Sequence, residues 1–194
     1  MQSDFETAYA KINLALHVRK RRDDGYHELE SLVAFLDDGD FLRVEPADYD
    51  SFSIEGEFAA NSGDISDNLV IKTLEWARQS ARERGYGDIT TLAIALSKHL
   101  PVAAGLGGGS ADAAALLRLL HRHGLIHSLL ELGPETAILG ADVPACLHSQ
   151  PLIMRGIGEQ IELVEDDSLH GIVAILLNPG FPVPTGPVFK AWDG

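Results

Sequence analysis

The sequence predicts an α+β fold, in which a mixed β-sheet is covered by helices. Segments with strand periodicity and segments with helix periodicity follow one another in mixed order, and the Asp24-Gly25 dipeptide is a strong signal for a β-hairpin turn. The 194 residues suit one domain, or one domain with part of a second, and they are enough to bury a substantial core.

The first expected element is a half-buried strand over residues 9–18. Apolar side chains alternate there with other residues, which places Ile12, Leu14, Leu16 and Val18 on one face of the strand. The other expected elements of this region are an exposed turn at 19–25, an extended segment at 28–36, a second turn at 37–40, and strands at 41–45 and 51–55.

Helix signals dominate the middle of the chain. Asp67 is expected to cap a helix that runs to about Arg84 and ends at Gly85, and a second helix is expected to start near Ser110. The remaining expected elements are a strand at 92–96, a shorter helical stretch up to about Leu139, and strands at 152–155, 160–164 and 171–177, the last of them buried on both faces.

Composition narrows the functional classes. The net charge of −14 disfavours binding to nucleic acid or to anionic membranes, because both reward a basic surface. Cys146 is the only cysteine, so the chain has no intrachain disulfide, as is usual in a reducing compartment. The N-terminal segment resembles neither a signal peptide nor a transit peptide, and no apolar run reaches the length of a membrane span. We therefore expect a cytoplasmic protein.

A glycine-rich segment is the most informative motif. It reads Gly105-Leu-Gly-Gly-Gly-Ser110 and lies between a predicted strand and a predicted helix. Glycine allows the backbone to approach a ligand closely, and the start of a helix offers free N–H groups and the positive end of a dipole. This arrangement favours a phosphate site over a simple turn. The Lys-Ser/Thr of a Walker loop and the last glycine of the dinucleotide fingerprint are both missing.

Several motifs together resemble the GHMP kinase superfamily. They are Ala10-Lys-Ile-Asn-Leu14, Asp24-Gly-Tyr-His-Glu-Leu29, Leu100-Pro101 with the glycine-rich segment, Leu139-Gly-Ala-Asp-Val-Pro144, Asn178-Pro-Gly180, Pro184-Thr185 and Phe189-Lys190. The Gly-Tyr-His and Gly-Ala-Asp-Val-Pro motifs are similar to those of the members that use ATP to phosphorylate the 2-hydroxyl of a cytidylyl-methylerythritol in non-mevalonate isoprenoid biosynthesis. Other members, such as homoserine, mevalonate or sugar kinases, remain alternatives.

The resemblance also implies a domain organisation. It assigns residues 1–164 to the N-terminal ATP-binding domain, whose fold is like that of ribosomal protein S5 domain 2, and 165–194 to the beginning of a C-terminal domain. Members of the family are longer and carry a second glycine-rich loop, so the resemblance implies a chain truncated at its C-terminus. A fragment that binds nucleotide without catalysis is therefore a further alternative.

The resemblance implies that Asp142 and Lys11 are the catalytic residues. Asp142 occupies the position of the family's catalytic aspartate, and the Lys11 ammonium is its expected partner. Without the resemblance, Asp142 would be interpreted as a turn or cap residue and Lys11 as a solvated side chain on a strand. Asn13 lies two residues beyond Lys11 on the same strand face, about 6–7 Å away, so both side chains can reach one pocket.

The remaining site residues also follow from the resemblance. Tyr26 suits stacking on a cytosine base and His27 suits a hydrogen bond to its edge, although packing beside a hairpin turn is the simpler explanation of both. Thr185 and Phe189 are expected to close the substrate pocket, to which Asn13 and Asp142 also belong. Residues expected to contact ATP are Asn68, Lys98, Leu100, Pro101, Gly105, Leu106, Gly107, Gly108, Gly109 and Ser110.

Partners are expected to be small molecules. Magnesium should enter with ATP, because it binds mainly through the phosphates and a few protein groups, of which Ser110 is one candidate. Ser110 could instead simply cap the helix that starts near it, which competes with its role as a magnesium ligand. Capping of the preceding helix by the Asp67-Asn68 pair likewise competes with the role of Asn68 in binding ATP. We expect no nucleic-acid or membrane partner, and a monomer or a weak homodimer.

Overall fold

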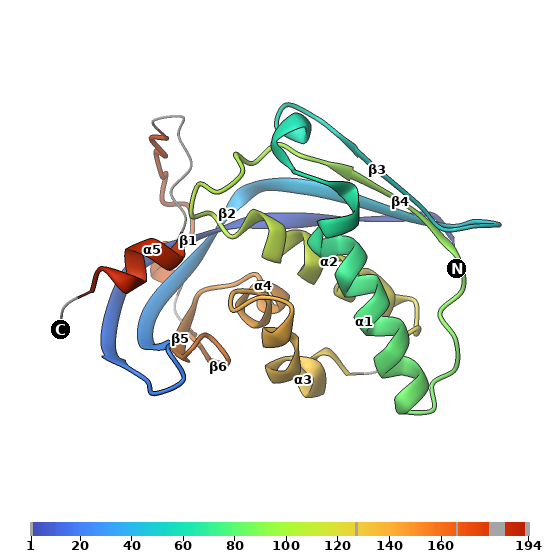
Figure 1. The fold of residues 1–194 in the computed structure, drawn as a ribbon. Helices are drawn as coiled ribbons and strands as arrows, with labels where there is room; N and C mark the ends of the chain where they lie inside the picture. Colours follow the sequence, from blue (N-terminus) through green and yellow to red (C-terminus); the bar gives the residue numbers. More distant parts are fainter. Residues whose placement is uncertain (1, 127, 166, 179–184, 193–194) are drawn as a thin grey trace.

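The computed structural model describes residues 2–126, 128–165, 167–178 and 185–192. These residues form a mixed sheet with α1, α2, α3 and α4 gathered on one side of it, which confirms the predicted α+β class (Figure 1). The strands are β1 (Asp4–Arg21), β2 (His27–Pro46), β3 (Ser51–Glu55), β4 (Leu92–Ser97), β5 (Leu152–Gly156) and β6 (Gln160–Leu163). The α-helices are α1 (Leu69–Glu83), α2 (Gly108–Arg122), α3 (Leu129–Leu132), α4 (Val143–His148) and α5 (Thr185–Lys190), and short 3-10 helices cover Ala59–Asn61, Ile65–Asp67, Pro134–Ile138 and Asp167–Leu169.

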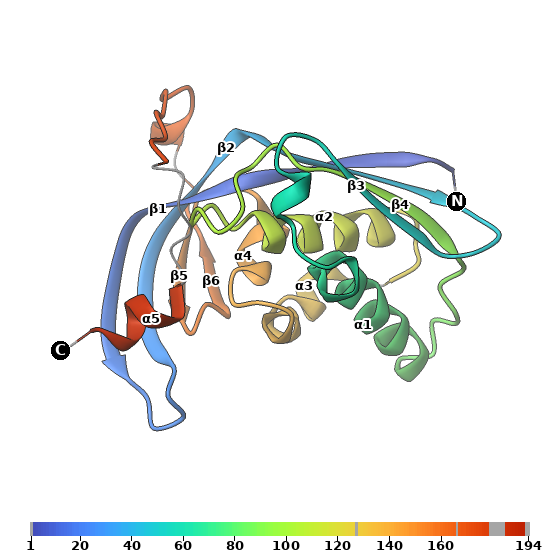
Figure 2. The same ribbon diagram turned by 45° about the horizontal axis from the view of Figure 1, so that its top comes forward.

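Strand β2 is the centre of the sheet. It pairs with β1 along nearly its whole length, and the two strands form a long curved ribbon (Figure 2). On its other edge, Phe41–Pro46 pairs with β4 and Leu29–Val33 pairs with β5, both antiparallel. Strand β3 is parallel to β4, and β6 is antiparallel to β5. One long strand thereby connects the part of the sheet that carries β3 and β4 to the part that carries β5 and β6.

Helix α2 is buried on almost all sides. It contacts β1, β2, α1 and α4, and its buried positions run from Ala111 to Leu120 with the exception of Arg118. The run of alanines at 113–115 leaves room for close neighbours, while Leu116, Leu117 and Leu120 fill the space against the sheet and α1. The helix that follows the glycine-rich segment is therefore the central element of the hydrophobic core.

The predicted turn at residues 37–40 is wrong, because β2 continues through it. Tyr9 pairs with Gly39 and Lys11 pairs with Phe35, so the extra residues of β2 form a bulge in a continuous strand. Gly39 lies against the β1 backbone, where an added Cβ would be 2.3 Å from the Ala8 carbonyl oxygen. The glycine thus permits close approach of two strands and does not reverse the chain.

Strand β1 is longer than predicted and its outer half is more exposed. Of the predicted half-buried face, Ile12 and Val18 are half-buried, but Leu14 and Leu16 between them are 46% and 40% exposed. The β1–β2 hairpin projects past the helices that cover the rest of the sheet (Figure 1). The predicted Asp24-Gly25 turn does close this hairpin, with Gly25 at φ +87°.

Residues 171–177, predicted as a strand buried on both faces, are neither paired nor buried. Val173, Ile175 and Leu177 are 87%, 84% and 91% exposed, and no described strand forms a ladder with this segment. The segment projects away from α1–α4 in both views (Figures 1 and 2). Its composition is that of a core strand, but the described part of the chain supplies no partner for it.

The starts of the two long helices differ from the prediction by one and two residues. Asn68 caps α1 by accepting a hydrogen bond from the Val70 N–H at 2.9 Å, whereas the predicted cap Asp67 forms an ion pair with Lys72. Helix α2 begins at Gly108, and its N-cap is Gly107 in the left-handed region at φ +66°. No side chain caps α2.

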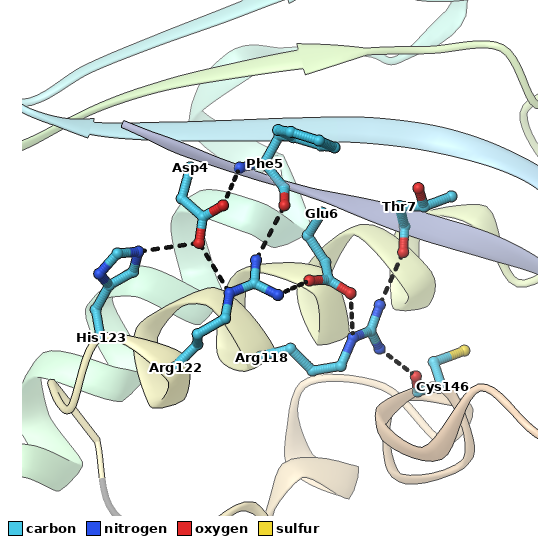
Figure 3. Close-up of polar contacts among 8 residues, drawn as sticks. All are labelled: Asp4, Phe5, Glu6, Thr7, Arg118, Arg122, His123 and Cys146. Atoms are coloured by element: carbon cyan, nitrogen blue, oxygen red, sulfur yellow. Dashed lines mark hydrogen bonds and ion pairs between the residues drawn. The ribbon is translucent and has the colours of Figure 1, made fainter. Parts of the chain in front are cut away.

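Two arginines of α2 attach the helix to the start of β1 (Figure 3). Arg118 donates to the Glu6 carboxylate at 3.0 Å, to the Thr7 carbonyl at 2.9 Å and to the Cys146 carbonyl at 2.6 Å, so one guanidinium connects β1, α2 and α4. Arg122 binds Asp4 and the other oxygen of Glu6, both at 2.8 Å. The Arg118 and Glu6 side chains are each only 15% exposed.

Replacing Arg118 with Met should destabilise the protein by about 2–4 kcal/mol, because one oxygen of Glu6 and two carbonyl groups lose their hydrogen-bond donor in a largely buried place. The measurement is the free energy of unfolding by urea. The matched variant Arg122→Met, whose side chain is 47% exposed, should cost about 1 kcal/mol or less. Equal losses for the two variants would contradict this assignment.

Candidate functional site

The glycine-rich segment forms a loop between β4 and the start of α2. Gly105 and Gly107 adopt φ values of +77° and +66°, which side chains rarely allow. At Gly107, a Cβ would also lie 3.1 Å from the Lys11 side chain, so glycine is needed there for space as well. Because no side chain caps α2, the first N–H groups of this helix are available for an anion.

A cavity of about 700 Å³ lies beside this loop. Its walls come from β1, the N-terminal end of α1, the loop, the first turn of α2, and Asp142 at the start of α4. The apolar side chains of Leu16, Leu29 and Met154 complete it. Residues of the predicted site that line it are Lys11, Asn13, Asn68, Lys98, Pro101, Gly105, Leu106, Gly107, Gly108, Gly109, Ser110, Asp142 and Phe189.

The two predicted catalytic residues form an ion pair in this cavity. The Lys11 ammonium lies 3.2 Å from an Asp142 carboxylate oxygen and donates to the Asn13 side-chain oxygen at 2.7 Å. The Lys11 side chain is 4% exposed and that of Asp142 is 32% exposed, so the carboxylate remains accessible from the cavity. Asp142 occupies the N-cap position of α4 but makes no side-chain capping bond. The capping explanation of this residue is therefore not supported.

Close packing brings the separate sequence motifs together. The Lys11 N–H donates to the Leu106 carbonyl at 2.9 Å, which attaches the glycine-rich loop to β1. An added Cβ at Gly140 would lie 3.3 Å from the Ser110 hydroxyl, so the start of α2 lies directly against the segment that precedes α4. Strand β1, the glycine-rich loop with the start of α2, and the segment before α4 are far apart in the sequence. They thus lie next to one another at the wall of the cavity.

The aromatic residues of the predicted substrate pocket are only partly assembled. His27 is 8% exposed, stacks on Phe189 with ring centroids 5.7 Å apart, and meets Trp192 edge-on at 5.9 Å. The Nε2 atom of His27 is buried without a hydrogen-bond partner among the described residues, and His27 does not line the cavity. Tyr26 is 60% exposed and does not line the cavity. The side chain of Thr185 and residues 179–184 lie outside the described part of the chain.

The residues predicted to flank the nucleotide differ in their surroundings. Asn68 lines the cavity while its side-chain oxygen caps α1. Leu100 is 4% exposed and does not line the cavity, although its N–H is fixed by the Asp40 carboxylate at 2.8 Å. Lys98 reaches the cavity wall, but its ammonium is held by Asp40 and, at 2.9 Å, by Asp112.

Sequence reasoning missed Asp40 and Asp112. Burial, together with the Asp40 charge, raises the pKa of Asp112 to about 7, although the Lys98 ammonium acts to lower it. The same two carboxylates outweigh burial at Lys98 and raise its pKa. The signal for Asp112 was an isolated carboxylate within the apolar stretch 111–117, whereas Asp40 was hidden in the supposed turn.

Two kinds of site are absent from the part of the chain that the structure describes, namely a membrane-spanning helix and a cluster of metal-binding side chains. None of the described helices is long and apolar enough to cross a membrane. Among the residues that the structure describes, no group of three or more His, Cys, Asp or Glu side chains is arranged to hold a metal ion.

Comparison with known proteins gives consistent matches. The family described as GHMP kinases N terminal domain matches residues 68–150. The 4-diphosphocytidyl-2-C-methyl-D-erythritol kinase of Novosphingobium aromaticivorans is 53% identical over 190 residues, and the enzyme of that name from Erythrobacter litoralis is 51% identical over 188. These alignments cover 97% and 96% of this chain but only 62% and 64% of the relatives.

A solved structure extends the likeness to three dimensions. The crystal structure of a 4-(cytidine 5'-diphospho)-2C-methyl-D-erythritol kinase matches with a TM-score of 0.72 and 32% identity, over 97% of this chain and 64% of that one. The chain therefore spans a little under two thirds of the length of the proteins it matches. The glycine-rich loop, the sheet and the sequence agree that residues 68–150 belong to a GHMP kinase N-terminal domain.

Proposed function

We propose that this chain carries the nucleotide site and the catalytic pair of an ATP-dependent kinase that phosphorylates a small alcohol. The observation that carries the proposal is the Lys11–Asp142 ion pair, which shares one cavity with the glycine-rich loop. Phosphoryl transfer requires two things of a protein, namely to position the acceptor hydroxyl and to stabilise charge on the phosphates. The two halves of this cavity match those two requirements.

The loop side of the cavity suits the phosphates of ATP. The free N–H groups at the start of α2 and the positive end of its dipole attract anions. Nine of the ten residues expected to contact ATP, all except Leu100, line the cavity and extend this surface from Asn68 to Ser110. Magnesium bound with ATP would neutralise charge on the phosphate oxygens, and the Ser110 hydroxyl, which lines the cavity, is a ligand type that this ion accepts.

Asp142 acts on the acceptor hydroxyl. In the proposed step the alcohol oxygen bonds to the γ-phosphorus, the bond from that phosphorus to the bridging oxygen breaks, and ADP leaves with the electron pair. The hydroxyl proton passes to the accessible carboxylate of Asp142. Lys11 keeps this carboxylate in place and puts a positive charge next to the developing alkoxide, while Asn13 fixes the ammonium from its other side.

The names of the relatives suggest the substrate. We propose the 2-hydroxyl of 4-diphosphocytidyl-2-C-methyl-D-erythritol as the acceptor, in isoprenoid precursor biosynthesis. His27 supports a base-recognition role because its buried Nε2 has no partner within the described protein, and an unpaired polar atom in such a place favours a ligand that pairs with it. Tyr26, Thr185 and Phe189 complete the proposed substrate contacts.

The setting proposed for this activity is the cytoplasm. The acidic composition, with a net charge of −14, suits small-molecule substrates and opposes nucleic-acid or anionic-membrane binding. We propose a monomer or a weak homodimer.

The experiment that tests the proposed function measures ADP release with a panel of alcohols. The panel contains the cytidylyl-methylerythritol, homoserine, mevalonate and galactose, and ATP binding is measured separately by calorimetry. We expect turnover with the first substrate alone. Turnover with another member would overturn the substrate assignment, and ATP binding without transfer to any of them would identify a nucleotide-binding protein instead.

Asp142→Asn and Lys11→Met should each lower kcat by about 10²–10⁴-fold, because the first removes the proton acceptor and the second removes the charge next to the developing alkoxide, and both should leave the dissociation constant for ATP nearly unchanged. The control is Lys20→Met, which removes a lysine that pairs with Glu28 at 3.5 Å and is 64% exposed. This control should retain full turnover. Near-normal kcat in both site variants would remove the catalytic assignment.

His27→Phe keeps an aromatic ring against Phe189 and removes the unpaired Nε2 atom. We expect the KM for the cytidylyl substrate to rise at least about 10-fold, because a buried polar contact with the base is worth about 1.5 kcal/mol or more, with the KM for ATP unchanged. Steady-state kinetics with each substrate varied in turn is the measurement. A parallel rise in both KM values would show that the ring has a general structural role.

A further inference from the structure

Three charged side chains are buried together beneath the glycine-rich loop. Asp40 comes from β2, Lys98 follows β4, and Asp112 lies in the second turn of α2. The three side chains are 0%, 5% and 5% exposed. Lys98 forms ion pairs with both carboxylates. Buried charges of this kind are costly, so their arrangement needs an explanation.

Asp40 fixes the start of the loop. One of its carboxylate oxygens accepts hydrogen bonds from the His99 N–H at 2.6 Å and the Leu100 N–H at 2.8 Å. The other oxygen accepts from the Lys98 ammonium. A single carboxylate in the middle of β2 thus orients the two residues at which the chain leaves β4.

Lys98 connects the start of the loop to α2. Its ammonium donates to the Asp112 carboxylate at 2.9 Å. Gly108, the first residue of α2, lies next to the Lys98 ammonium. A Cβ at this position would be 3.3 Å from the Lys98 nitrogen and 3.5 Å from an Asp40 carboxylate oxygen. The Lys98 backbone is also held, because its N–H donates to the Glu55 carbonyl at 2.7 Å and its carbonyl accepts from the Phe58 N–H at 3.2 Å.

The middle of the loop has no comparable support. Val102 is 40% exposed, Ala103 has the strained φ of +55°, and a Cβ at Gly105 would meet no atom within 4 Å. The spacing between the two fixed ends, together with the Lys11–Leu106 backbone hydrogen bond, therefore determines where the loop's amides lie. One oxygen of Asp112 is buried without a partner among the described residues.

We propose that Asp40, Lys98 and Asp112 form a positioning cluster that joins the start of the glycine-rich loop to the start of α2 and so holds the loop's N–H groups ready for the phosphates. The proposal rests on the proposed nucleotide-binding function. In it Lys98 acts through the loop, because its charge is already shared between two carboxylates inside the protein. Backbone amides and the helix dipole receive the phosphates.

Two variants and a control test this assignment. Lys98→Met removes the ammonium and preserves most of its volume, and Asp112→Ala breaks only the link to α2 while the Lys98–Asp40 pair remains. If Lys98→Met does not fold, Asp112→Ala carries the test alone. Arg118→Met is the control, because it weakens attachment of the same helix at its other end without touching the loop.

The first measurement is hydrogen exchange of peptides covering residues 99–109 without nucleotide, and the second is ATP binding by calorimetry. We expect Asp112→Ala to speed exchange of the loop amides at least about 10-fold and to raise the dissociation constant for ATP by a similar factor, both measured well below the thermal unfolding midpoint of the variant. Arg118→Met should lower the midpoint and leave both loop measurements unchanged.

The two measurements separate the possible failures. Unchanged loop exchange in Asp112→Ala would overturn the positioning cluster whether or not the protein binds ATP. Faster exchange with unaltered ATP affinity would overturn its functional role. Absence of ATP binding in the unmodified protein would overturn the proposed function, while the exchange data would still show whether the cluster orders the loop.

Discussion

The site depends on one residue, Lys11, where the sheet, the glycine-rich loop and the start of α4 meet. Its N–H holds the Leu106 carbonyl, its side chain packs where a Cβ at Gly107 would stand, and its ammonium reaches Asp142. An ammonium that is 4% exposed is stable only with such partners. The burial of Lys11 therefore fixes the distance between the loop and the acidic side chain.

Helix α2 connects the site to the hydrophobic core of the protein. It is too deeply buried to shift without disturbing the core, and charged groups hold it at both ends. Lys98 binds Asp112 near its start, while Arg118 binds Glu6 and the Cys146 carbonyl near its end (Figure 3). The site is thus assembled on a rigid element, which is what accurate placement of phosphate-binding amides requires.

Local signals in the sequence were enough to find the elements, but not their partners. Alternation predicted β1 and Asp24-Gly25 predicted its hairpin, because both signals depend on neighbouring residues only. Gly39 misled the prediction, since its role is close contact with β1 and a distant contact leaves no local trace. The prediction for residues 171–177 was wrong for the opposite reason. Their composition is typical of a buried strand, yet burial depends on a partner that the described chain does not offer.

The same distinction applies to the site. The glycines of the loop could be predicted because a phosphate-binding turn requires them at that spacing. Lys11 and Asp142 were found only through the family resemblance, since 131 positions separate them and nothing local marks either as catalytic. Asp40 and Asp112 were missed because each is explained only by Lys98, a residue of another element.

An acidic protein that binds a polyphosphate needs a favourable electrostatic potential at the binding site in spite of its negative net charge. The chain carries a net charge of −14, yet the carboxylates nearest the loop are each paired with a lysine. Lys11 offsets Asp142 on one side. Beneath the loop, Lys98 offsets one charge of the Asp40 and Asp112 pair, and the raised pKa of Asp112 reduces the other. No described side chain caps α2, so its first main-chain N–H groups are available at the positive end of the helix. Buried lysines therefore screen the fold's own carboxylates, and this leaves the backbone dipoles free to attract phosphate.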